Sequence, residues 1–334
     1  MFDLKTEIKL NDSYNTITYY SLEEKNKIIF KSHYHNFLNK DVRKPRFVPV
    51  SNKEWKTIHN ICKYIFSVGE IAIHFNFYFP SQKWIVSDIV RALLYKLKEG
   101  CSFKSLEKIF GISHSTLSNS FSVLQKFNVF SLSYSKLLKK YYGRRFIDKL
   151  KYRLTDTSSV VNKGCTEEVN YNKYYGRKKI SKISTETDSD GIAIGLKIVA
   201  GNVTDNKIYR QQVFEERFID EKMDIETRKY LLADSGYDDK ETLSTIRENN
   251  FTPIVRQNKR NIKDRNKIRE MTKYETKIYK KRIKIENSYC TMKKNKDINA
   301  IYYKKINSFK NMVILSFIYN LTSILENNEE DKIK

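Results

Sequence analysis

The basic segment over residues 279–293 places a single carboxylate among cations and a phenol. Glu286 is the carboxylate. Tyr279 lies seven residues before it, Arg282 four before it and Lys293 seven after it. If the segment is a helix, all four side chains fall within an arc of about 60°, because a helix turns roughly 100° per residue. Such a face suits a group that holds a metal ion beside a phosphate backbone. The alternative is a solvated helix in which Arg282 and Glu286 form an ordinary i,i+4 ion pair.

The chain is basic along its whole length. It has 63 Lys and Arg against 39 Asp and Glu, a formal net charge of +24 over 334 residues. This excess favours a polyanionic partner, with nucleic acid first and an anionic membrane second. The alternative is a bias of composition, because heavy use of Lys, Asn, Ile and Tyr is typical of AT-rich coding sequence. Charge alone therefore does not decide the partner.

Cysteine spacing and hydropathy exclude several classes of protein. The four cysteines lack CxxC spacing, which argues against a zinc site and a disulfide framework and fits a reducing compartment. Charged side chains interrupt the apolar run over residues 61–79, and the run over 312–325 is shorter than the roughly 20 residues that a bilayer needs. No apolar run follows the N-terminus, so we expect no signal peptide. We expect a soluble protein with no membrane partner.

Residues 84–127 are expected to be helical and contain a helix-turn-helix pattern. Gly111 would end a short helix, because the turn there needs a residue that tolerates positive φ. Ser113 would then cap a second helix over about residues 115–126, and that helix would enter a DNA major groove. The apolar residues expected between the helices are Ile109, Ile112, Leu117 and Phe121. The side chains expected to reach bases or phosphates are Ser115, Thr116, Ser118 and Asn119. The alternative is a purely structural helical pair.

From residue 140 onward, strand patterns alternate with helices. The basic aromatic stretch over residues 139–145 is interpreted as a bridge, either a phosphate-contacting linker or a solvated loop. Asp188 and Asp190 belong to a predicted hairpin turn, where we expect them to be solvated. The predicted order is a strand at 149–155, a hairpin of strands at 179–187 and 192–200, a helix at 206–218, a strand at 230–233, a helix at 240–249, a strand at 253–256, the Glu286 helix, and a helix at 309–325.

Two aspartates stand at predicted strand ends. Asp156 follows the first strand, and Asp234 follows the strand at 230–233. The carboxyl ends of neighbouring strands meet at one edge of a sheet, so these residues and Glu286 would form a cluster of three carboxylates. Hard oxygen donors suit Mg²⁺ or Mn²⁺ better than zinc, and two such ions can activate a water or a 3′-hydroxyl and stabilise the leaving oxygen of a phosphodiester. Each aspartate could instead cap a loop. Asp205 could support this site or cap the next helix.

Residues 149–325, just over half the chain, resemble the catalytic domain of DDE transposases of bacterial insertion sequences. The matching motifs are Leu154-Thr155-Asp156-Thr157, Gly201-Asn202-Val203-Thr204-Asp205, Ala233-Asp234-Ser235-Gly236-Tyr237, and a tyrosine–arginine–glutamate–lysine signature at Tyr279, Arg282, Glu286 and Lys293. The resemblance implies a ribonuclease-H-like fold and a catalytic, metal-binding triad of Asp156, Asp234 and Glu286. It also implies that Tyr279, Arg282 and Lys293 face DNA. The chain departs from the family in lacking a histidine at residues 175–179, and the short spacing from Asp234 to Glu286 leaves no room for a large insertion domain.

The sequence therefore predicts an α/β chain with three parts. Residues 1–80 are a basic region of unassigned role, 81–139 a helical DNA-binding region with the helix-turn-helix, and 140–328 a ribonuclease-H-like catalytic domain with a mixed sheet flanked by helices. The resemblance implies a Mg²⁺-dependent enzyme, with Mn²⁺ as a substitute, that cleaves DNA at element ends and joins 3′-hydroxyls to target DNA.

The expected partner is double-stranded DNA, both the terminal inverted repeats of the element and its target, bound by at least a dimer. The expected location is the cytoplasm or nucleoid for a bacterial element, and the nucleus or a viral factory for a eukaryotic or viral one. Two alternatives remain: a domesticated sequence-specific DNA-binding protein, and a nuclease of the same fold.

Overall fold

The computed structural model describes residues 57, 60, 61, 86–143, 149–172, 176, 178–211, 216–219, 229–259, 262 and 268–330. Two compact units divide the chain. The first comprises residues 1–93 with 102–129, and the second comprises residues 94–101 with 130–334. Almost all of the N-terminal region predicted over residues 1–80 lies outside the described residues, and the three predicted domain boundaries stay predictions.

The first unit contains the predicted pair of short helices, α5 (Phe103–Phe110) and α6 (His114–Lys126), after the first half of α4 (Val86–Glu99). Gly111 has a φ of 68°, and its N–H donates to the carbonyl of Glu107. The hydroxyl of Ser113 accepts the N–H of Thr116 and so caps α6. Both caps are as predicted. The predicted apolar residues between the helices are buried except Ile109, which is half-buried, and Leu106 joins them.

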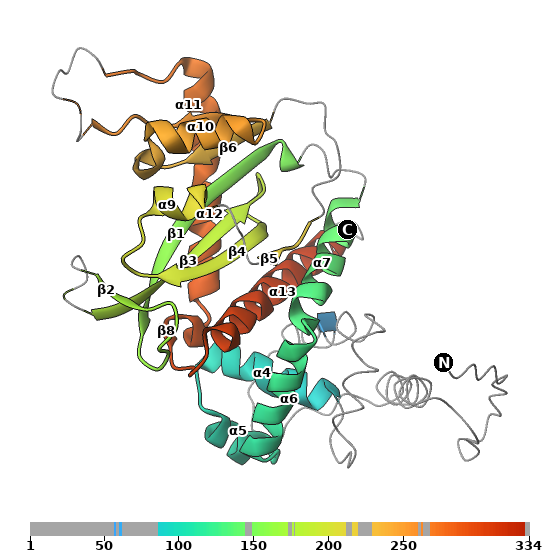
Figure 1. The fold of residues 1–334 in the computed structure, drawn as a ribbon. Helices are drawn as coiled ribbons and strands as arrows, with labels where there is room; N and C mark the ends of the chain where they lie inside the picture. The colour runs from blue at the N-terminus through green and yellow to red at the C-terminus, as the bar shows by residue number, and fades with distance from the viewer. Residues whose placement is uncertain are drawn as a thin grey trace, which may run out of the picture. The chain divides into compact units, whose positions relative to one another are not determined.

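The second unit is built on a mixed sheet, shown in Figure 1. Its strands are β1 (Tyr152–Asn162), β2 (Asn170–Asn172), β3 (Lys178–Thr187), β4 (Ala193–Ala200), β5 (Glu216–Arg217), β6 (Lys229–Ala233), β7 (Phe251–Val255) and β8 (Ala300–Ile301). The main order is β5-β4-β3-β1-β6-β7, with β2 beside β3 and β8 beside β1. The pairs among β1, β3 and β4 are antiparallel, whereas β6 and β7 run parallel to β1. This topology confirms the predicted ribonuclease-H-like mixed sheet.

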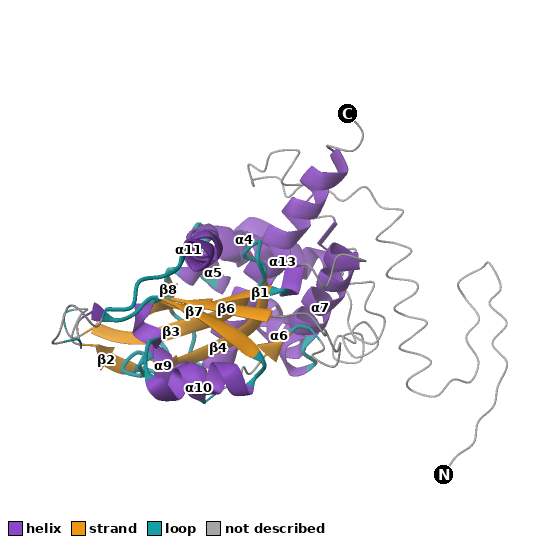
Figure 2. Cartoon of the chain, turned by 90° about the horizontal axis from the view of Figure 1, so that it is seen from above, coloured by secondary structure: helices purple, strands orange, loops and turns teal. Residues whose placement is uncertain are grey.

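Helices flank both faces of this sheet. They are α7 (Val129–Tyr142), α9 (Asp205–Arg210), α10 (Lys240–Glu248), α11 (Lys273–Tyr279), α12 (Ile283–Lys293) and α13 (Ile306–Glu330), with short 3₁₀ turns η3 (Ser235–Tyr237), η6 (Lys280–Arg282) and η7 (Lys296–Ile298). Figure 2 shows α9 and α10 on one face, with α11 and α13 on the other. Residues of β3 and β4 are mostly buried because a sheet covered on both faces has little solvent contact. No helix of the described residues is long and apolar enough to cross a membrane.

Three predicted element boundaries are wrong. Asp156 does not end its strand, because β1 continues to Asn162 in register with β3. The helix predicted over residues 206–218 ends at Arg210, and residues 216–217 instead form β5 on the edge of the sheet. The bridge predicted over residues 139–145 is helical as far as Tyr142, because Tyr142 continues the buried face of α7.

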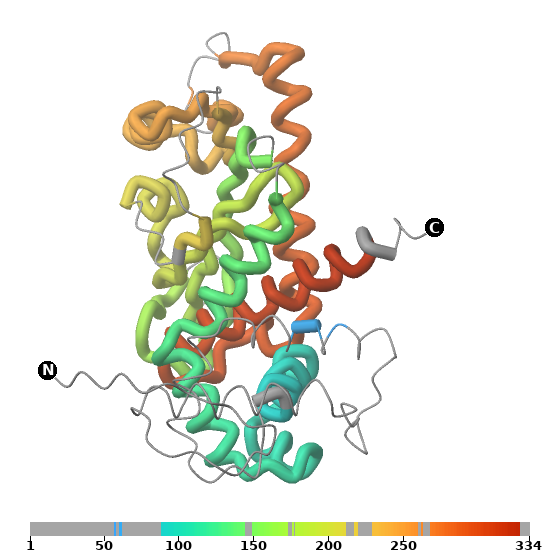
Figure 3. The backbone as a smooth tube through the Cα atoms, turned by 90° about the vertical axis from the view of Figure 1, so that its right-hand side faces the viewer, coloured from blue at the N-terminus to red at the C-terminus, as the bar shows by residue number. Residues whose placement is uncertain are grey.

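The segment carrying Glu286 is helical, as predicted, but it is not one α-helix. The 3₁₀ turn η6 separates α11 from α12 and includes Arg282. The backbone remains right-handed helical at Tyr279, Lys280, Arg282 and Ile283. Figure 3 accordingly shows this segment, coloured orange, as one continuous column. A tighter turn changes the angle between side chains on either side of it.

Candidate active site

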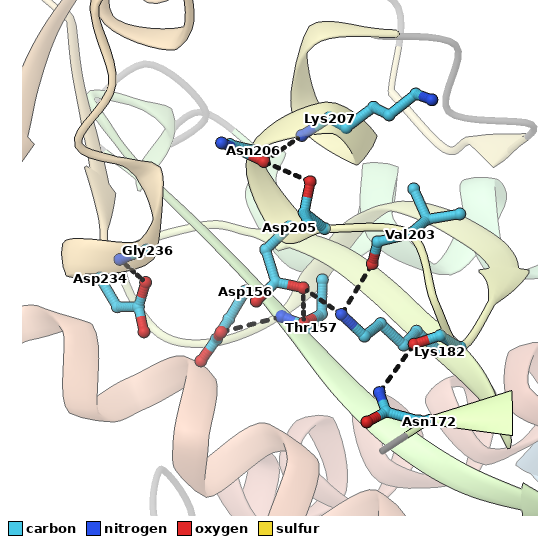
Figure 4. A network of polar contacts seen from close by, with 12 residues as sticks. Asp156, Thr157, Asn172, Lys182, Val203, Asp205, Asn206, Lys207, Asp234 and Gly236 are labelled. Carbon is cyan, nitrogen blue, oxygen red and sulfur yellow. Dashed lines mark hydrogen bonds and ion pairs between the residues drawn. The ribbon is translucent and has the colours of Figure 1, made fainter. Parts of the chain in front are cut away.

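Asp156 lies on β1, and Asp234 directly follows the adjacent parallel strand β6. Leu154 of β1 is in register with Leu232 of β6, so each aspartate lies two residues beyond this pair. The Oδ1 atom of Asp234 accepts the N–H of Gly236 at 2.7 Å and fixes the turn after β6. Figure 4 shows both aspartates in one view. Asp234 is close enough to raise the pKa of Asp156, although Asp156 lies inside its strand rather than at its end.

Asp156 is a mostly buried carboxylate that lies near both positive and negative side chains. Its side chain is 16% exposed. Burial raises its pKa to about 6, against the lowering effects of Arg282 and the N–H of Thr157, while Asp234 and Asp205 raise it further. The Thr157 N–H donates to Oδ1 at 2.8 Å, and Nη2 of Arg282 donates to Oδ2 at 3.0 Å. The positive charge of Arg282 and the N–H of Thr157 therefore do not fully offset the cost of burying the ionised Asp156.

Arg282 joins the strand carboxylate to the helix carboxylate. Its Nη1 donates to Oε1 of Glu286 at 2.5 Å, while Nη2 reaches Asp156. The i,i+4 ion pair that was the simpler interpretation is therefore present, but the same guanidinium also bonds a residue far away in the sequence. Burial lowers the pKa of Arg282, and the facing Asp156, Tyr279 and Glu286 more than offset this and raise it. Among the described residues, its buried Nε finds no hydrogen-bond partner.

The other two signature residues lie on either side of this ion pair. Tyr279 is 9% exposed, burial raises the pKa of its phenol, and the guanidinium of Arg256 lies 4.6 Å from the centre of its ring. Nζ of Lys293 donates to the carbonyl of Ser159 at 3.2 Å, farther along β1. Arg282 and Lys293 thus contact β1 at Asp156 and Ser159, whereas Tyr279 packs against Arg256, the residue after β7.

Asp205 supports β1 beside Asp156, which decides between the two roles considered for it. Its Oδ1 accepts the hydroxyl of Thr157 at 2.7 Å and Nζ of Lys182 at 2.8 Å, as Figure 4 shows. The N-cap of α9 is Thr204, whose side chain makes no capping bond. Lys182 also donates to the carbonyl of Val203 at 2.8 Å. The network holds the loop before α9 against the strand that carries Asp156.

Arg256 is a cation near this site that the sequence did not single out. Val255 of β7 is in register with Ala233 of β6, so Arg256 follows its strand just as Asp234 follows the neighbouring one. The sequence did carry a signal for Arg256, because this basic residue directly follows the strand that pairs with the one before Asp234. It was missed because the predicted strand over residues 253–256 included it as an ordinary strand residue.

The prediction that Asp188 is solvated is wrong. This side chain accepts the N–H groups of Asp190 and Ile192 at 2.8 and 2.9 Å and the hydroxyl of Tyr142 at 3.1 Å. It is fully buried, and burial raises its pKa to about 6. Asp190 is partly exposed and forms an ion pair with Lys149. The turn is therefore a packed corner of the second unit.

The predicted DNA-contacting residues of α6 lie near the start of that helix. Ser115 and Asn119 are exposed, whereas Thr116 and Ser118 are half-buried. The hydroxyls of Ser115 and Thr116 bond to that of Ser113. Asn119 is exposed and takes no part in these hydrogen bonds of the N-cap. Contact of the four with DNA stays a prediction.

The chemistry of the three carboxylates fits a hard divalent cation, because all their donors are oxygen. Their present arrangement is not a closed ligand set: in the described part of the chain, no three His, Cys, Asp or Glu side chains are grouped to hold one ion. The guanidinium of Arg282 occupies the position between Asp156 and Glu286. The guanidinium thus places one positive charge beside both carboxylates.

The family model of the transposase DDE domain matches residues 154–321, which is half of the chain and includes all three carboxylates. The chain belongs to the DDE transposase family. No curated protein matches the sequence of this DDE transposase. Among solved structures, the Mos1 mariner paired-end complex with Mn is similar at 11% identity, over 74% of this chain and 99% of that chain, with a TM-score of 0.24. The Mos1 paired-end complex with the left transposon end is similar at 12% identity, over 82% and 98%, also with a TM-score of 0.24.

Proposed function

We propose that this DDE transposase cleaves phosphodiester bonds at the ends of its element and joins the freed 3′-hydroxyls to target DNA. One observation carries the proposal. Within the matched domain, Asp156 on β1 and Asp234 directly after β6 belong to adjacent strands, and Arg282 bonds both Asp156 and Glu286 of α12. Three carboxylates beside several cations suit chemistry on a phosphodiester, because the carboxylates bind metal and the cations bind phosphate.

Asp156, Asp234 and Glu286 would hold Mg²⁺, with Mn²⁺ as a substitute. When bound, the metal supplies activation of the attacking water or 3′-hydroxyl and stabilises charge on the leaving oxygen. The raised pKa of Asp156 supports this assignment, because a buried carboxylate that is short of positive charge gains from a cation.

The cations would position the DNA strand. Arg282 has a buried Nε donor without a partner among the described residues, and an unsatisfied buried donor favours a ligand oxygen. A guanidinium can bind phosphate through two donors at once. Arg256, held over the ring of Tyr279, and Lys293, at the end of α12 and bonded to the carbonyl of Ser159 on β1, would contact the DNA backbone on either side of Arg282. Phosphate contacts of this kind fix the register of the strand without reading its sequence.

The helix-turn-helix of the first unit would recognise the DNA sequence of the element ends. Its exposed Asn119 and Ser115 are suited to base or phosphate contacts, and the inverted repeats at the element ends are the proposed sites. Because two ends must be held together for joining, we propose a dimer or larger assembly on DNA. The location would follow the host of the element.

A strand-joining assay tests this function. The full-length protein is incubated with a labelled oligonucleotide that carries an element end with a free 3′-hydroxyl, a target plasmid, and Mg²⁺ or Mn²⁺. We expect labelled plasmid, and no product when the 3′-hydroxyl is replaced by hydrogen or the metal is removed by a chelator. Tight binding of the ends without joining in either metal would contradict the proposal and point to a domesticated DNA-binding protein.

A further inference from the structure

Tyr289 connects the helix of Glu286 to the strand of Asp156 through a single hydroxyl. It is three residues beyond Glu286 on α12, and its side chain is 8% exposed. The hydroxyl donates to the carbonyl of Asp156 at 2.7 Å and shares the same hydrogen with the carbonyl of Ile183 at 3.1 Å. It accepts the N–H of Thr185 at 3.2 Å and the hydroxyl of Thr185 at 2.8 Å. A phenol has one hydrogen to donate and two lone pairs, so its bonding capacity is full.

The partners of this hydroxyl belong to two paired strands. Asp156 of β1 and Thr185 of β3 are direct partners in the sheet register. Tyr289 therefore bonds both members of one cross-strand pair, and one of them carries the strand carboxylate of the site. Because Tyr289 hydrogen-bonds to main-chain atoms at Asp156 and its partner, it holds α12 at a fixed distance from Asp156.

Apolar packing alone does not set this distance. Ile285 and Met292 of α12 are 0% and 1% exposed, but burial of apolar surface is non-directional and tolerates sliding of a helix. Hydrogen bonds depend steeply on length and angle. The hydroxyl of Tyr289 is the directional contact between this turn of the helix and the main chain of Asp156.

We propose that Tyr289 is a positioning residue, whose hydroxyl sets the register of α12 against β1 and so the placement of Glu286 and Arg282 relative to Asp156. This inference rests on the proposed function. The reaction requires the carboxylates on the two elements to act on the same phosphodiester. A displacement of about 1 Å in such a site lowers a rate on the order of 100-fold.

The test replaces Tyr289 with phenylalanine, which removes only the hydroxyl. Tyr134→Phe is the matched control, because Tyr134 is 1% exposed in the same unit and donates to the carbonyl of Ala193 at 2.8 Å. Three quantities are measured on the full-length protein: the rate of Mn²⁺-dependent cleavage at saturating element-end DNA, the dissociation constant for that DNA, and hydrogen exchange of the α12 amides.

We expect Tyr289→Phe to lower the cleavage rate at least roughly ten-fold with little change in DNA affinity, because positioning affects the reacting geometry more than binding. Exchange in α12 should be faster by about five-fold, the effect of one lost hydrogen bond. Tyr134→Phe should change the rate by less than about two-fold, as expected for a hydroxyl remote from the reacting groups. Cleavage by Tyr289→Phe at the control rate would overturn the inference.

A second variant covers the case in which Tyr289→Phe does not fold. Thr185→Val removes one hydroxyl partner of Tyr289 and leaves the bond to Asp156, so it should lower the rate in the same direction by a smaller factor; an unchanged rate would overturn the inference. If the wild type does not cleave under either metal, the proposed function fails. Hydrogen exchange then still decides the role of Tyr289, because unchanged exchange in α12 would show that its hydroxyl does not fix the helix.

Discussion

Replacing Arg282 with methionine separates the charge of this side chain from its packing. Methionine keeps an unbranched, flexible side chain that fills much of the same space, but both bonds to Asp156 and Glu286 are lost. Without the cation, the pKa of Asp156 rises above its value of about 6, because burial then acts against less compensation. The resulting loss of unfolding free energy therefore depends on pH.

Protonation limits the cost at Asp156. With a pKa of about 6, its ionised form at pH 7 is favoured over the protonated form by about 1.4 kcal/mol, since one pKa unit corresponds to 1.36 kcal/mol. In the variant, Asp156 takes up a proton rather than remain an unpaired buried charge, so the loss of unfolding free energy from this pair is at most about 1.4 kcal/mol at pH 7. At pH 5 most wild-type molecules already carry the proton, and the same calculation gives about 0.1 kcal/mol. The stabilisation is therefore present above pH 6 and is lost as the pH falls through 6.

Urea unfolding of the wild type and Arg282→Met at pH 5 and pH 7 measures this difference. The bond to Glu286 adds little, because that carboxylate is 51% exposed. The same substitution in an Asp156→Asn background is the control, and it should cost the same at both pH values. An equal loss at pH 5 and pH 7 in the wild-type background would refute the reasoning, since it would mean that Arg282 acts through packing.

Three further predictions concern the supports of the site and the DNA-binding unit. Gly191 has a φ of 86°, and an added Cβ would lie 2.6 Å from the carbonyl oxygen of Lys284. Gly191→Ala should therefore cost more than about 1 kcal/mol, and more in urea unfolding than Gly176→Ala, where φ is 61° and no described residue lies within 4 Å of an added Cβ. An equal loss in both would remove the contact with Lys284 as the cause. Asp188 has a pKa raised from 3.8 to about 6 by burial, so wild-type stability should fall as the pH rises from 4 to 6, by up to about 3 kcal/mol relative to Asp188→Asn; parallel pH profiles of the two proteins would show that the pKa of Asp188 is not raised by folding. Thr116→Glu combined with Asn119→Glu should weaken binding to element ends at least about ten-fold by repelling phosphates, and unchanged mobility-shift titrations would exclude α6 from the interface.

Much of the second unit was predictable because its signals are local. Alternating apolar residues and the turn at residues 188–191 define β3 and β4, and the buried run of β6 is bounded by Asp234. In the first unit, Gly111 and Ser113 define the helix ends by their own backbone and side-chain chemistry. These features need no knowledge of distant parts of the chain.

The misses come from contacts between distant segments. The polar residues of β1 after Asp156 do not read as a strand, yet their pairing with β3 keeps them extended. Asp188 is buried because Tyr142 of α7 covers the turn. In the sequence Tyr289 looks like an ordinary buried aromatic, and its hydrogen bonds to β1 and β3 depend on how these strands pack beside α12. The position of Arg282 between two carboxylates likewise depends on the fold.

The most direct test of the catalytic assignment is strand cleavage of DNA that carries an uncut element end with its flank. The wild type is compared with Asp156→Ala in Mg²⁺ and in Mn²⁺, and binding of the same DNA is measured alongside. The account predicts metal-dependent nicks at the element boundary for the wild type, and none for Asp156→Ala at unchanged DNA affinity. Cleavage by Asp156→Ala at the wild-type rate would contradict it, because the strand carboxylate would then have no part in the reaction.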